Sequence, residues 1–425
     1  MKKNLSMVIV LFWVTACFAG KNHFPEQPYP ALDLKSDLEH HVATSDDPFS
    51  YPLTEASKKV SITQFGWVTS HKLPEEVRAQ RSNNNVSITV FENRLFMAFR
   101  TSTTHFASSK TRIYIMSSLN GVDWDFEADV YRETDLREPQ LIVMNGQLNF
   151  IFFEGGVNPF KFKPTEMLRL TRLSQGHWSE PVPFLEKGEV PWEVKTRQGA
   201  TYLTSYKGTH YSIKDPSSID VMFKKTLDGV FFTAADETAA STVVYNGGVS
   251  EMGWEFDHEG NVWGVTRDED GDRNGFGSQL MFAPKDHLKQ WKTMAPIDRN
   301  CYMSPKMFRV GEELYLIGRR QLGPHPFGRT DFGAPIPWQR INNWVTHSLS
   351  AKGTGLYHIN KKTFAIELVM DLPGHGDTAF PSIYRISERE FLVANYTSRL
   401  DRPNRSWIHG QLAPTEVYLM KLKFE

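Results

Sequence analysis

Residues that can donate, accept or neutralise charge recur along this chain just before or just after apolar segments. They are mainly arginines, histidines, tyrosines and carboxylates, with few lysines among them. The set comprises Arg100, His105, Arg137, Glu138, Trp192, Lys195, Tyr206, His210, Tyr211, Glu251, Arg267, Arg319, Arg320, Asp377 and Tyr396. A guanidinium group pairs bidentately with a carboxylate or a sulfate, and aromatic rings offer flat surfaces for sugars. Gathered on one face, such a set is suited to an anionic carbohydrate.

Several of these residues also have a structural interpretation. His105 can cap a loop, and Arg137 with Glu138 can form a local ion pair that braces the start of a strand. Tyr206 and Tyr211 can pack between strands, although one of them is expected near a cavity. Residue types alone leave these alternatives open, because the same side chains serve both purposes.

An acidic segment could suggest a metal site, since Asp268, Asp270 and Asp272 alternate like the ligands of a calcium loop. Gly275 lies two residues too late for such a loop, and no closing Glu stands at the required spacing. We therefore expect a solvated acidic loop, no required cofactor and no metal site. Cys301 is expected to be a small buried residue rather than a nucleophile or a ligand.

Repeated elements must position these residues, because they are spread over the whole chain. Six hairpins with turns rich in Asn, Gly and Glu can be superposed, at 86–100, 139–155, 192–208, 252–268, 304–320 and 380–396. Third strands are expected at 112–118, 167–173, 219–226, 278–282, 354–359 and 415–423. A repeat of about 50 residues with four strands is typical of a β-propeller. The sequence predicts an all-β fold, with a single β-propeller catalytic domain over residues 59–425.

The C-terminal repeat has no fourth strand after Glu425, and residues 59–68 can supply it by closing the ring. The repeat count predicts six blades; a seventh, built from the irregular segment 21–58, stays open. A Gly- and Pro-rich insertion at 321–350 is predicted to be a loop. The functional face is expected where the second and third strands of each blade connect.

Two third strands end in a related turn, Ser118–Trp124 and Thr226–Phe232. Both fit the pattern S/T-x-D/N-G-x-x-aromatic, a shortened form of the Asp-box turn. In this turn a hydroxyl and a carboxylate or amide brace the backbone while the aromatic residue packs between strands. The expected role is structural, so these residues are not catalytic candidates.

Residues 1–20 have a basic start and a short apolar core, which is typical of a bacterial export signal. The run from Val14 to Cys17 resembles a lipobox and predicts lipidation of Cys17, with ordinary cleavage near Gly20 as the alternative. We expect an exported lipoprotein of the outer membrane or periplasm, or a secreted protein. The formal net charge of −1, from 48 Lys and Arg against 49 Asp and Glu, argues against a nucleic-acid partner.

The six hairpins, the Asp-box turns and phrases such as DTAFPSIYRI and LVANYTS resemble the sialidase-like propeller superfamily. More narrowly, FRTSTTHFASSKTRIYIMSSLNGVDW, DLREPQL and GVSEMGWEFDHEGNVWGVTRDEDGD resemble propeller-type ulvan lyases and related ulvan-active enzymes of marine bacteria. The resemblance implies a His and a Tyr that act as acid and base, and an Arg that neutralises a uronate carboxylate. His105 matches the His, and Tyr206 is the first choice for the Tyr with Tyr211 as fallback. Arg137, Arg267 or Arg319 could be the neutralising Arg, of which Arg137 is taken as the catalytic one.

The resemblance thus implies a carbon–oxygen lyase acting by β-elimination on a uronate-containing, sulfated polysaccharide or its oligosaccharides, by chain cleavage or by dehydration. A second His is missing after Trp124, which leaves room for dehydration. One alternative is a sialidase-type glycosidase that uses Tyr396, Glu251 and Asp377 with three arginines. Another is a surface glycan-binding lipoprotein without catalysis.

Overall fold

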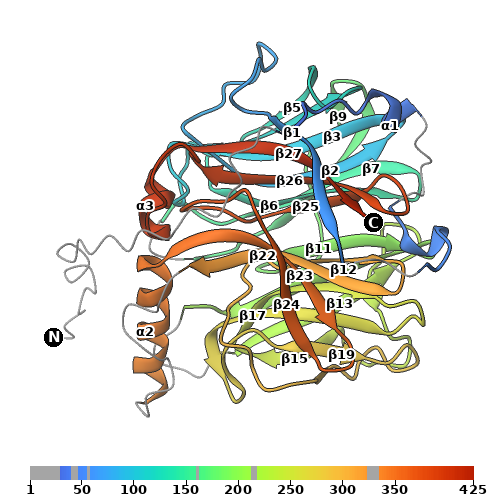
Figure 1. Ribbon diagram of the computed structural model, residues 1–425, viewed down its shortest axis with the longest axis vertical. Helices are drawn as coiled ribbons and strands as arrows, with labels where there is room; N and C mark the ends of the chain where they lie inside the picture. Colours follow the sequence, from blue (N-terminus) through green and yellow to red (C-terminus); the bar gives the residue numbers. More distant parts are fainter. Residues whose placement is uncertain (1–28, 40–45, 55–57, 159–161, 212–217, 323–334) are drawn as a thin grey trace.

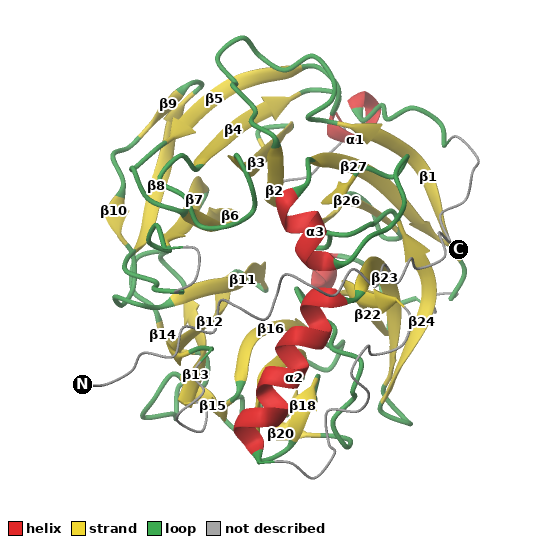
Figure 2. Cartoon of the chain, turned by 90° about the vertical axis from the view of Figure 1, so that its left-hand side faces the viewer, coloured by secondary structure: helices red, strands yellow, loops and turns green. Residues whose placement is uncertain are grey.

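The computed structural model describes residues 29–39, 46–54, 58–158, 162–211, 218–322 and 335–425. The described chain is mostly β-structure, and its antiparallel sheets are arranged around a common centre (Figure 1, Figure 2). This confirms an all-β, propeller-like architecture. The expected export signal and its lipobox lie outside the described residues.

The strands follow the predicted repeats. The first repeat forms β2 (Ser82–Phe91), β3 (Arg94–Ser102), β4 (Arg112–Ser118) and β5 (Trp124–Val130). The second forms β6 (Leu136–Met144), β7 (Gln147–Glu154), β8 (Met167–Ser174), β9 (His177–Trp178) and β10 (Val182–Pro183). The third forms β11 (Val190–Arg197), β12 (Ala200–Thr209), β13 (Ser218–Thr226), β14 (Thr233–Ala234) and β15 (Val243–Gly247).

The remaining repeats are built in the same way. The fourth forms β16 (Val249–Phe256), β17 (Val262–Asp272), β18 (Gly275–Gly277), β19 (Leu280–Ala283) and β20 (Lys292–Thr293). The fifth forms β21 (Lys306–Val310), β22 (Glu313–Leu322), β23 (Ala351–Asn360) and β24 (Ala365–Leu372). The last forms β25 (Ser382–Arg385), β26 (Glu390–Ser398) and β27 (Thr415–Phe424), beside β1 (Val60–Trp67). All six predicted hairpins and third strands are present.

The N-terminal strand β1 pairs with the C-terminal strand β27. The two are antiparallel, from Val60 opposite Phe424 to Trp67 opposite Tyr418. This is the pairing that the sequence predicts for residues 59–68. One parallel residue pair also links β27 to β2, so the last repeat and the first share a sheet.

Tight turns set the register of the hairpins. In the first hairpin Glu92 and Asn93 have φ of 51° and 57°, and in the second Asn145 and Gly146 have 49° and 73°. Two successive residues at positive φ are characteristic of type I′ turns, whose twist matches that of the paired strands. The turn residues visible in the sequence therefore act through their backbone conformation.

The innermost strand of each of the first four repeats has a shift in its pairing register close to its first residues. The register shifts at Asn84–Val86 in β2, Arg137–Gln140 in β6, Pro191–Glu193 in β11 and Val249–Glu251 in β16. Within the first two shifts, the backbone of Asn85 and of Glu138 has φ of 43° and 52°, values that residues other than glycine rarely adopt. A bulge redirects the side chains beside it. Here it brings Glu138 and Glu251, from two different sheets, close enough to interact electrostatically.

Charged side chains fill the centre of the fold. Arg197 donates two hydrogen bonds to Glu255, at 3.0 and 2.7 Å, and Lys195 donates to the carbonyl of Met307 at 2.6 Å. The hollow that the innermost strands leave between them measures only about 60 Å³. A sugar therefore has no room in the centre, and a ligand site must lie at one end of the fold.

The two Asp-box-like turns have the expected bracing role. Ser118 Oγ accepts the N–H of Gly121 at 2.8 Å, and Asn120 Oδ1 accepts the next two backbone N–H groups. Trp124 is buried in the core. Asp228 accepts an equivalent pair of backbone hydrogen bonds in the second turn. These contacts confirm the structural assignment.

The predicted loop at 321–350 is wrong for its second half, because Ile336–Leu349 forms helix α2; residues 323–334 lie outside the described part. Pro337 is in the first turn of the helix, where proline is tolerated. Beyond it the run has no Gly or Pro, and Trp344 and Val345 lie over the cavity described below. The other helices are short: α1 (Lys35–Glu39), α3 (Trp407–Leu412) and the 3₁₀ turn η1 (Pro48–Ser50).

The expected solvated acidic loop is also wrong, since Asp268, Glu269 and Asp270 are buried in β17. Hydrogen bonds replace the solvent, because Asp268 accepts from the amide of Gln279 at 3.0 Å and Asp270 pairs with His210 at 2.8 Å. The sequence shows the acids but not the partners that come from other strands. No helix in the described ranges is long and apolar enough to cross a membrane.

Ser118→Ala should destabilise the fold by about 1–3 kcal/mol, because a buried hydroxyl that accepts a backbone N–H and donates to the carbonyl of Asp123 is lost. The matched control is Ser118→Thr, which keeps the hydroxyl and reproduces Thr226 of the second turn. Free energies of unfolding from denaturant titration measure both. Equal stability of the Ala and Thr variants would contradict the bracing role.

Candidate active site

A cavity of about 430 Å³ lies at the end of the fold that α2 and α3 cover. Figure 2 shows both helices crossing in front of the common centre of the sheets. The cavity is lined by Phe106, Asp135, Arg137, Phe162, Tyr211, Arg267, Glu269, Trp344, His347, Trp407 and Gln411, among others. Arginines, carboxylates and aromatic rings therefore face one partly open cavity.

The two helices form a roof that is attached to the sheets. The Asn343 side chain of α2 donates to the carbonyl of Glu269 at 3.0 Å. The rings of His347 in α2 and Trp407 in α3 lie 4.9 Å apart, which joins the two helices. The roof therefore covers part of the cavity.

His105 is held by a buried carboxylate. Its Nδ1 lies 2.6 Å from Oδ2 of Asp377, and the hydroxyl of Tyr396 donates to the other oxygen of Asp377 at 3.0 Å. A carboxylate only accepts, so we assign the ring proton to Nδ1, which leaves the lone pair on Nε2. Burial lowers the pKa of His105 to about 4 despite the nearby Asp377. His105 is therefore a neutral imidazole at pH 7; its ring is buried behind the cavity lining, which includes the next residue, Phe106.

Arg137 is fixed between Asp135 and His105. Its Nε donates to Asp135, and its Nη2 donates to the backbone carbonyl of His105 at 2.7 Å. Asp135 also accepts from Arg100 at 2.5 Å and from the Thr111 hydroxyl at 2.8 Å. Within the described residues Nη1 of Arg137 has no partner, and its side chain is 21% exposed. Arg137 thus presents an unpaired cationic edge to the cavity.

Arg267 also lines the cavity, but its donors are occupied. Nη1 pairs with Glu251, Nε donates to Glu269 at 2.6 Å, and Nη2 donates to the Tyr211 hydroxyl at 3.3 Å. Partial loss of solvent and the charge of Glu269 raise the pKa of Tyr211 well above its usual value, although 43% of its surface is exposed. Tyr211 therefore keeps its proton at neutral pH and presents a hydroxyl to the cavity.

The charge of Glu138 acts on Tyr206, and the pKa values of both side chains are raised. Burial, with the charge of Glu251, raises the pKa of Glu138 to about 7, and Asn85 donates to its Oε2 at 3.3 Å. Burial and the charges of Glu138 and Glu251 also raise the pKa of Tyr206 well above its usual value. Tyr206 is 6% exposed and packs in an apolar cluster. It is therefore held more deeply than Tyr211.

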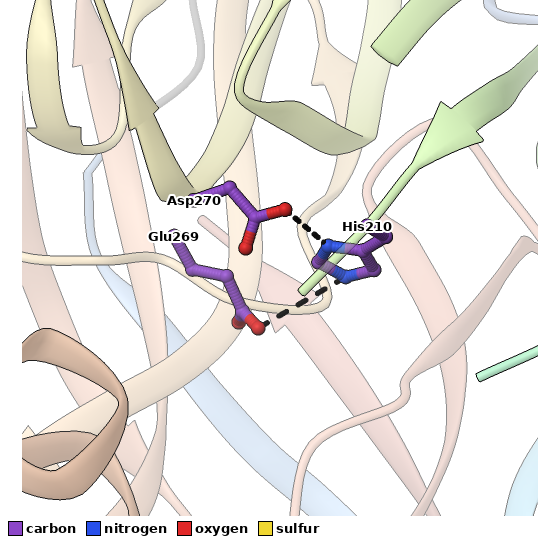
Figure 3. Close-up of side chains that lie close together, drawn as sticks. All are labelled: His210, Glu269 and Asp270. Atoms are coloured by element: carbon purple, nitrogen blue, oxygen red, sulfur yellow. Dashed lines mark hydrogen bonds and ion pairs between the residues drawn. The ribbon is translucent and has the colours of Figure 1, made fainter. Parts of the chain in front are cut away.

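Figure 3 shows the one group of described residues whose spacing could hold a metal ion, His210, Glu269 and Asp270. Their ligand atoms lie within 4.8 Å of one another. Asp270 accepts from His210 and from the N–H of Tyr211 at 3.0 Å, and Glu269 pairs with Arg267. The neighbouring cation and these internal contacts satisfy most of the cluster, so we assign it to fixing Tyr211, whose ring stacks on His210 at 3.7 Å.

Several expected binding residues do not face the cavity. Trp192 is buried and donates to the carbonyl of Pro305 at 3.0 Å, and Lys195 belongs to the filled centre. Arg320 pairs with Asp371 on the neighbouring strands of the fifth repeat. Arg100, which is 0% exposed, holds Asp135.

Arg319 also acts within the protein. Its Nε donates to the carbonyl of Thr378 at 2.7 Å and its Nη2 to that of Ala379 at 3.2 Å. These bonds fix the segment that carries Asp377. Arg319 therefore supports the carboxylate that orients His105.

Sequence reasoning missed several residues of the site. Asp135 opens the DLREPQL segment next to Arg137, so its acidic side chain was a visible signal. Trp344, Trp407 and Gln411 carried no such signal, because they belong to roof helices that lie outside the strand repeat.

Helix α3 lies directly on the backbone that precedes Asp377. A Cβ atom at Gly410 would come within 2.1 Å of the Asp377 nitrogen. Only glycine permits this approach, which places Gln411 of α3 with its amide nitrogen 3.0 Å from Nδ1 of His105. The roof and the His105–Asp377 pair therefore share one contact.

No protein-family model matches the chain, and no curated protein matches its sequence. Among solved structures, a protein of unknown function from Dyadobacter fermentans has a TM-score of 0.55 at 12% identity, over 86% of this chain and 99% of that one. Trypanosoma rangeli sialidase in complex with sialic acid has a TM-score of 0.52 at 11% identity, over 84% of this chain and 58% of that one. A mutant of this sialidase that displays trans-sialidase activity has a TM-score of 0.50 at 11% identity, over 87% and 59%.

The chain thus spans less than two thirds of the length of the sialidase structures. At such low identities the similarity shows the fold alone. The chain has an all-β, propeller-like fold of the kind found in a sialidase.

Proposed function

We propose that the protein is a carbohydrate-active enzyme, specifically a carbon–oxygen lyase that eliminates across C4 and C5 of a uronate in an acidic, ulvan-like polysaccharide or its oligosaccharides. One observation carries the proposal: Arg137, with its unpaired Nη1, donates to the backbone of His105 at 2.7 Å. A cation for the uronate carboxylate and a neutral base are thereby held together. The sialidase-like fold supports a sugar substrate.

The reaction begins at the weakly acidic C5–H bond. Arg137 pairs with the substrate carboxylate and stabilises the negative charge that spreads onto it as the proton leaves. His105 Nε2 takes the C5 proton, and Asp377 stabilises the imidazolium that forms. Electrons of the C5–H bond form the C4–C5 double bond, and the bond from C4 to its oxygen breaks.

The departing oxygen needs a proton, which we assign to Tyr211. Its raised pKa keeps the hydroxyl protonated, and it lines the same cavity as Arg137. The sequence favours Tyr206, but the more buried position of Tyr206 makes Tyr211 the better donor. If the oxygen belongs to a sugar the chain is cleaved, and if it belongs to a hydroxyl group water is lost.

A sialidase-type hydrolase is the second candidate, because the fold resembles a sialidase. That mechanism needs a Tyr activated by a Glu and three convergent arginines. Here Tyr396 donates to Asp377 instead, Glu251 pairs with Arg267, and Arg319 binds backbone carbonyls. The expected hydrolytic set is thus occupied by internal contacts, which favours elimination. A glycan-binding lipoprotein without catalysis would not need the base His105.

Other features belong to the same proposal. We propose a ring of six four-stranded blades that β1 and β27 complete, supported by their pairing. The chemistry requires no cofactor. The partner is the anionic glycan, with no nucleic acid, and lipidation of Cys17 would anchor an exported protein at the outer membrane or in the periplasm.

Incubation with ulvan and ulvan oligosaccharides should raise the ultraviolet absorbance of the 4,5-unsaturated uronate. New reducing ends would accompany the rise if the chain is cleaved and would be absent if water is lost. A sialoside assayed in parallel is the control. Constant absorbance on every uronate together with sialoside hydrolysis would refute elimination in favour of the second candidate.

Tyr211→Phe should lower kcat by about 10²–10⁴-fold, because the proton donor to the leaving oxygen is removed. Tyr206→Phe is the matched control, since the same atom is deleted from the neighbouring, deeper tyrosine. Initial rates of unsaturated uronate formation measure both variants. The opposite ranking would return the role to Tyr206.

Activity should persist at mildly acidic pH and fall only as the pH approaches about 4, since His105 must be neutral to act as base and its pKa is lowered to about 4. Asp377→Asn should lower kcat by about 10²–10⁴-fold, because an amide can donate to Nδ1 and so favour the wrong tautomer. Asp371→Asn, which loosens Arg320 outside the cavity, is the control and should stay near wild type. An acidic limb near pH 6.5 in the pH–rate profile would contradict the neutral buried base.

A further inference from the structure

A second hollow, of about 540 Å³, lies on the other side of α3 from the cavity. Its polar lining includes Arg81, His375, Arg399, Arg402, Arg405 and His409, and we name it the arginine groove. These residues come from separate parts of the chain: Arg81 precedes β2, His375 precedes Asp377, and the rest lie between β26 and β27. The fold therefore gathers them into one positively charged surface.

The charge of the arginine groove is largely uncompensated. None of the described residues that line it is an Asp or a Glu. Arg399 pairs with Asp401 at 2.7 and 2.9 Å, and Arg402 lies 4.0 Å from the same carboxylate. Arg81 and Arg405 form no side-chain hydrogen bond or ion pair with any part of the chain that the structure describes. In the wall, His375 is 4% exposed, and burial lowers its pKa, so the charge of the groove comes from its arginines. The groove thus offers unused donors and positive charge.

Helix α3 separates the arginine groove from the cavity. Trp407 and Gln411, one turn apart, line the cavity, whereas His409 and Leu412 line the groove. A helix with its side chains is about 10–12 Å wide, so one extended oligosaccharide can reach both sides. Underneath α3 the groove also lies next to the His105–Asp377 pair, because Gly376 lines the groove and the next residue, Asp377, orients His105.

We propose that the arginine groove is a second binding site for the acidic polysaccharide, which holds sulfate or carboxylate groups of the same chain whose reacting uronate occupies the cavity. This inference rests on the proposed function for its substrate class. Guanidinium groups pair bidentately with both anions, which suits a chain that carries either. The enzyme then binds long chains more tightly than short ones.

The lining favours a soluble polyanion over a membrane. Leu412 is the only large apolar residue among the described residues of the groove. A surface that binds a bilayer needs apolar side chains to insert beside its basic ones. Anionic lipid is therefore kept as an outcome of the test.

The test compares two double variants of the full chain that remove equal charge. Arg402→Gln/Arg405→Gln alters the arginine groove, where both side chains are exposed. Lys285→Gln/Lys292→Gln alters exposed lysines beside β19 and β20 and is the matched control. Equilibrium affinity is measured for polymeric ulvan and for anionic phosphatidylglycerol vesicles, and kcat/KM is measured on an ulvan tetrasaccharide.

The groove variant should bind ulvan polymer at least about 10-fold more weakly, the loss expected for charge-assisted contacts, and should act on the tetrasaccharide within about twofold of wild type. The control should match wild type in both assays. Unchanged polymer affinity of the groove variant, equal losses in both variants, no polymer binding by the wild type, or a loss confined to vesicles would each overturn the proposal. Binding is read without turnover, so absence of unsaturated uronate would refute the lyase function while leaving the groove result intact.

Discussion

The buried carboxylate of Asp135 is the interaction on which the candidate site depends. It accepts hydrogen bonds from Arg100 and Arg137, which belong to neighbouring repeats, and so links two sheets at the level of the cavity. Two guanidinium groups can be buried together only because a carboxylate lies between them. With its Nε held in this way, Arg137 turns one edge to the His105 backbone and the other to the cavity. The guanidinium edge that faces a ligand is thus the part of Arg137 that the internal ion-pair network leaves without a partner.

Burial sets the protonation states of the site. Loss of solvent around the buried ring leaves His105 neutral, which is the state that a base needs in order to take a proton from carbon. The same exclusion of water strengthens the interaction of Arg137 with an anion. The protonation state of the base and the strength of the cation therefore both follow from burial of these two side chains.

The repeat in the sequence predicts the strands because each hairpin combines alternating apolar residues with a recognisable turn. The pairing of residues 59–68 with the C-terminal strand follows from the missing strand of the last repeat, and β1 does pair with β27. The helix over 336–349 was hidden by the Gly- and Pro-rich residues before it. A local composition rule treats the whole insertion as loop, whereas the helix forms over the cavity and its Asn343 bonds to the carbonyl of Glu269.

The sequence predicted which residues belong to the candidate site, but not which of their side chains face the cavity. His105, Arg137 and Asp377 were all expected at this end of the fold, and the structure brings them together. Trp192 and Lys195 occupy equivalent places in the repeat, yet both are buried within the fold. The position of a residue along its strand predicts how near it lies to each end of the fold. Whether a side chain faces a cavity depends on the bulges and on neighbouring sheets, which the sequence does not display.

The pairing of β1 with β27 limits when the sheet can be completed during synthesis. The first strand of the sheets finds its partner only in the last ten residues of the chain, and the N–H of Glu425 donates to the carbonyl of Lys59. A nascent chain therefore carries β1 with an open edge until β27 has been made. Contacts between residues so distant in sequence form slowly. Loss of β27 would leave β1 without its partner, and an unpaired strand is able to join other molecules.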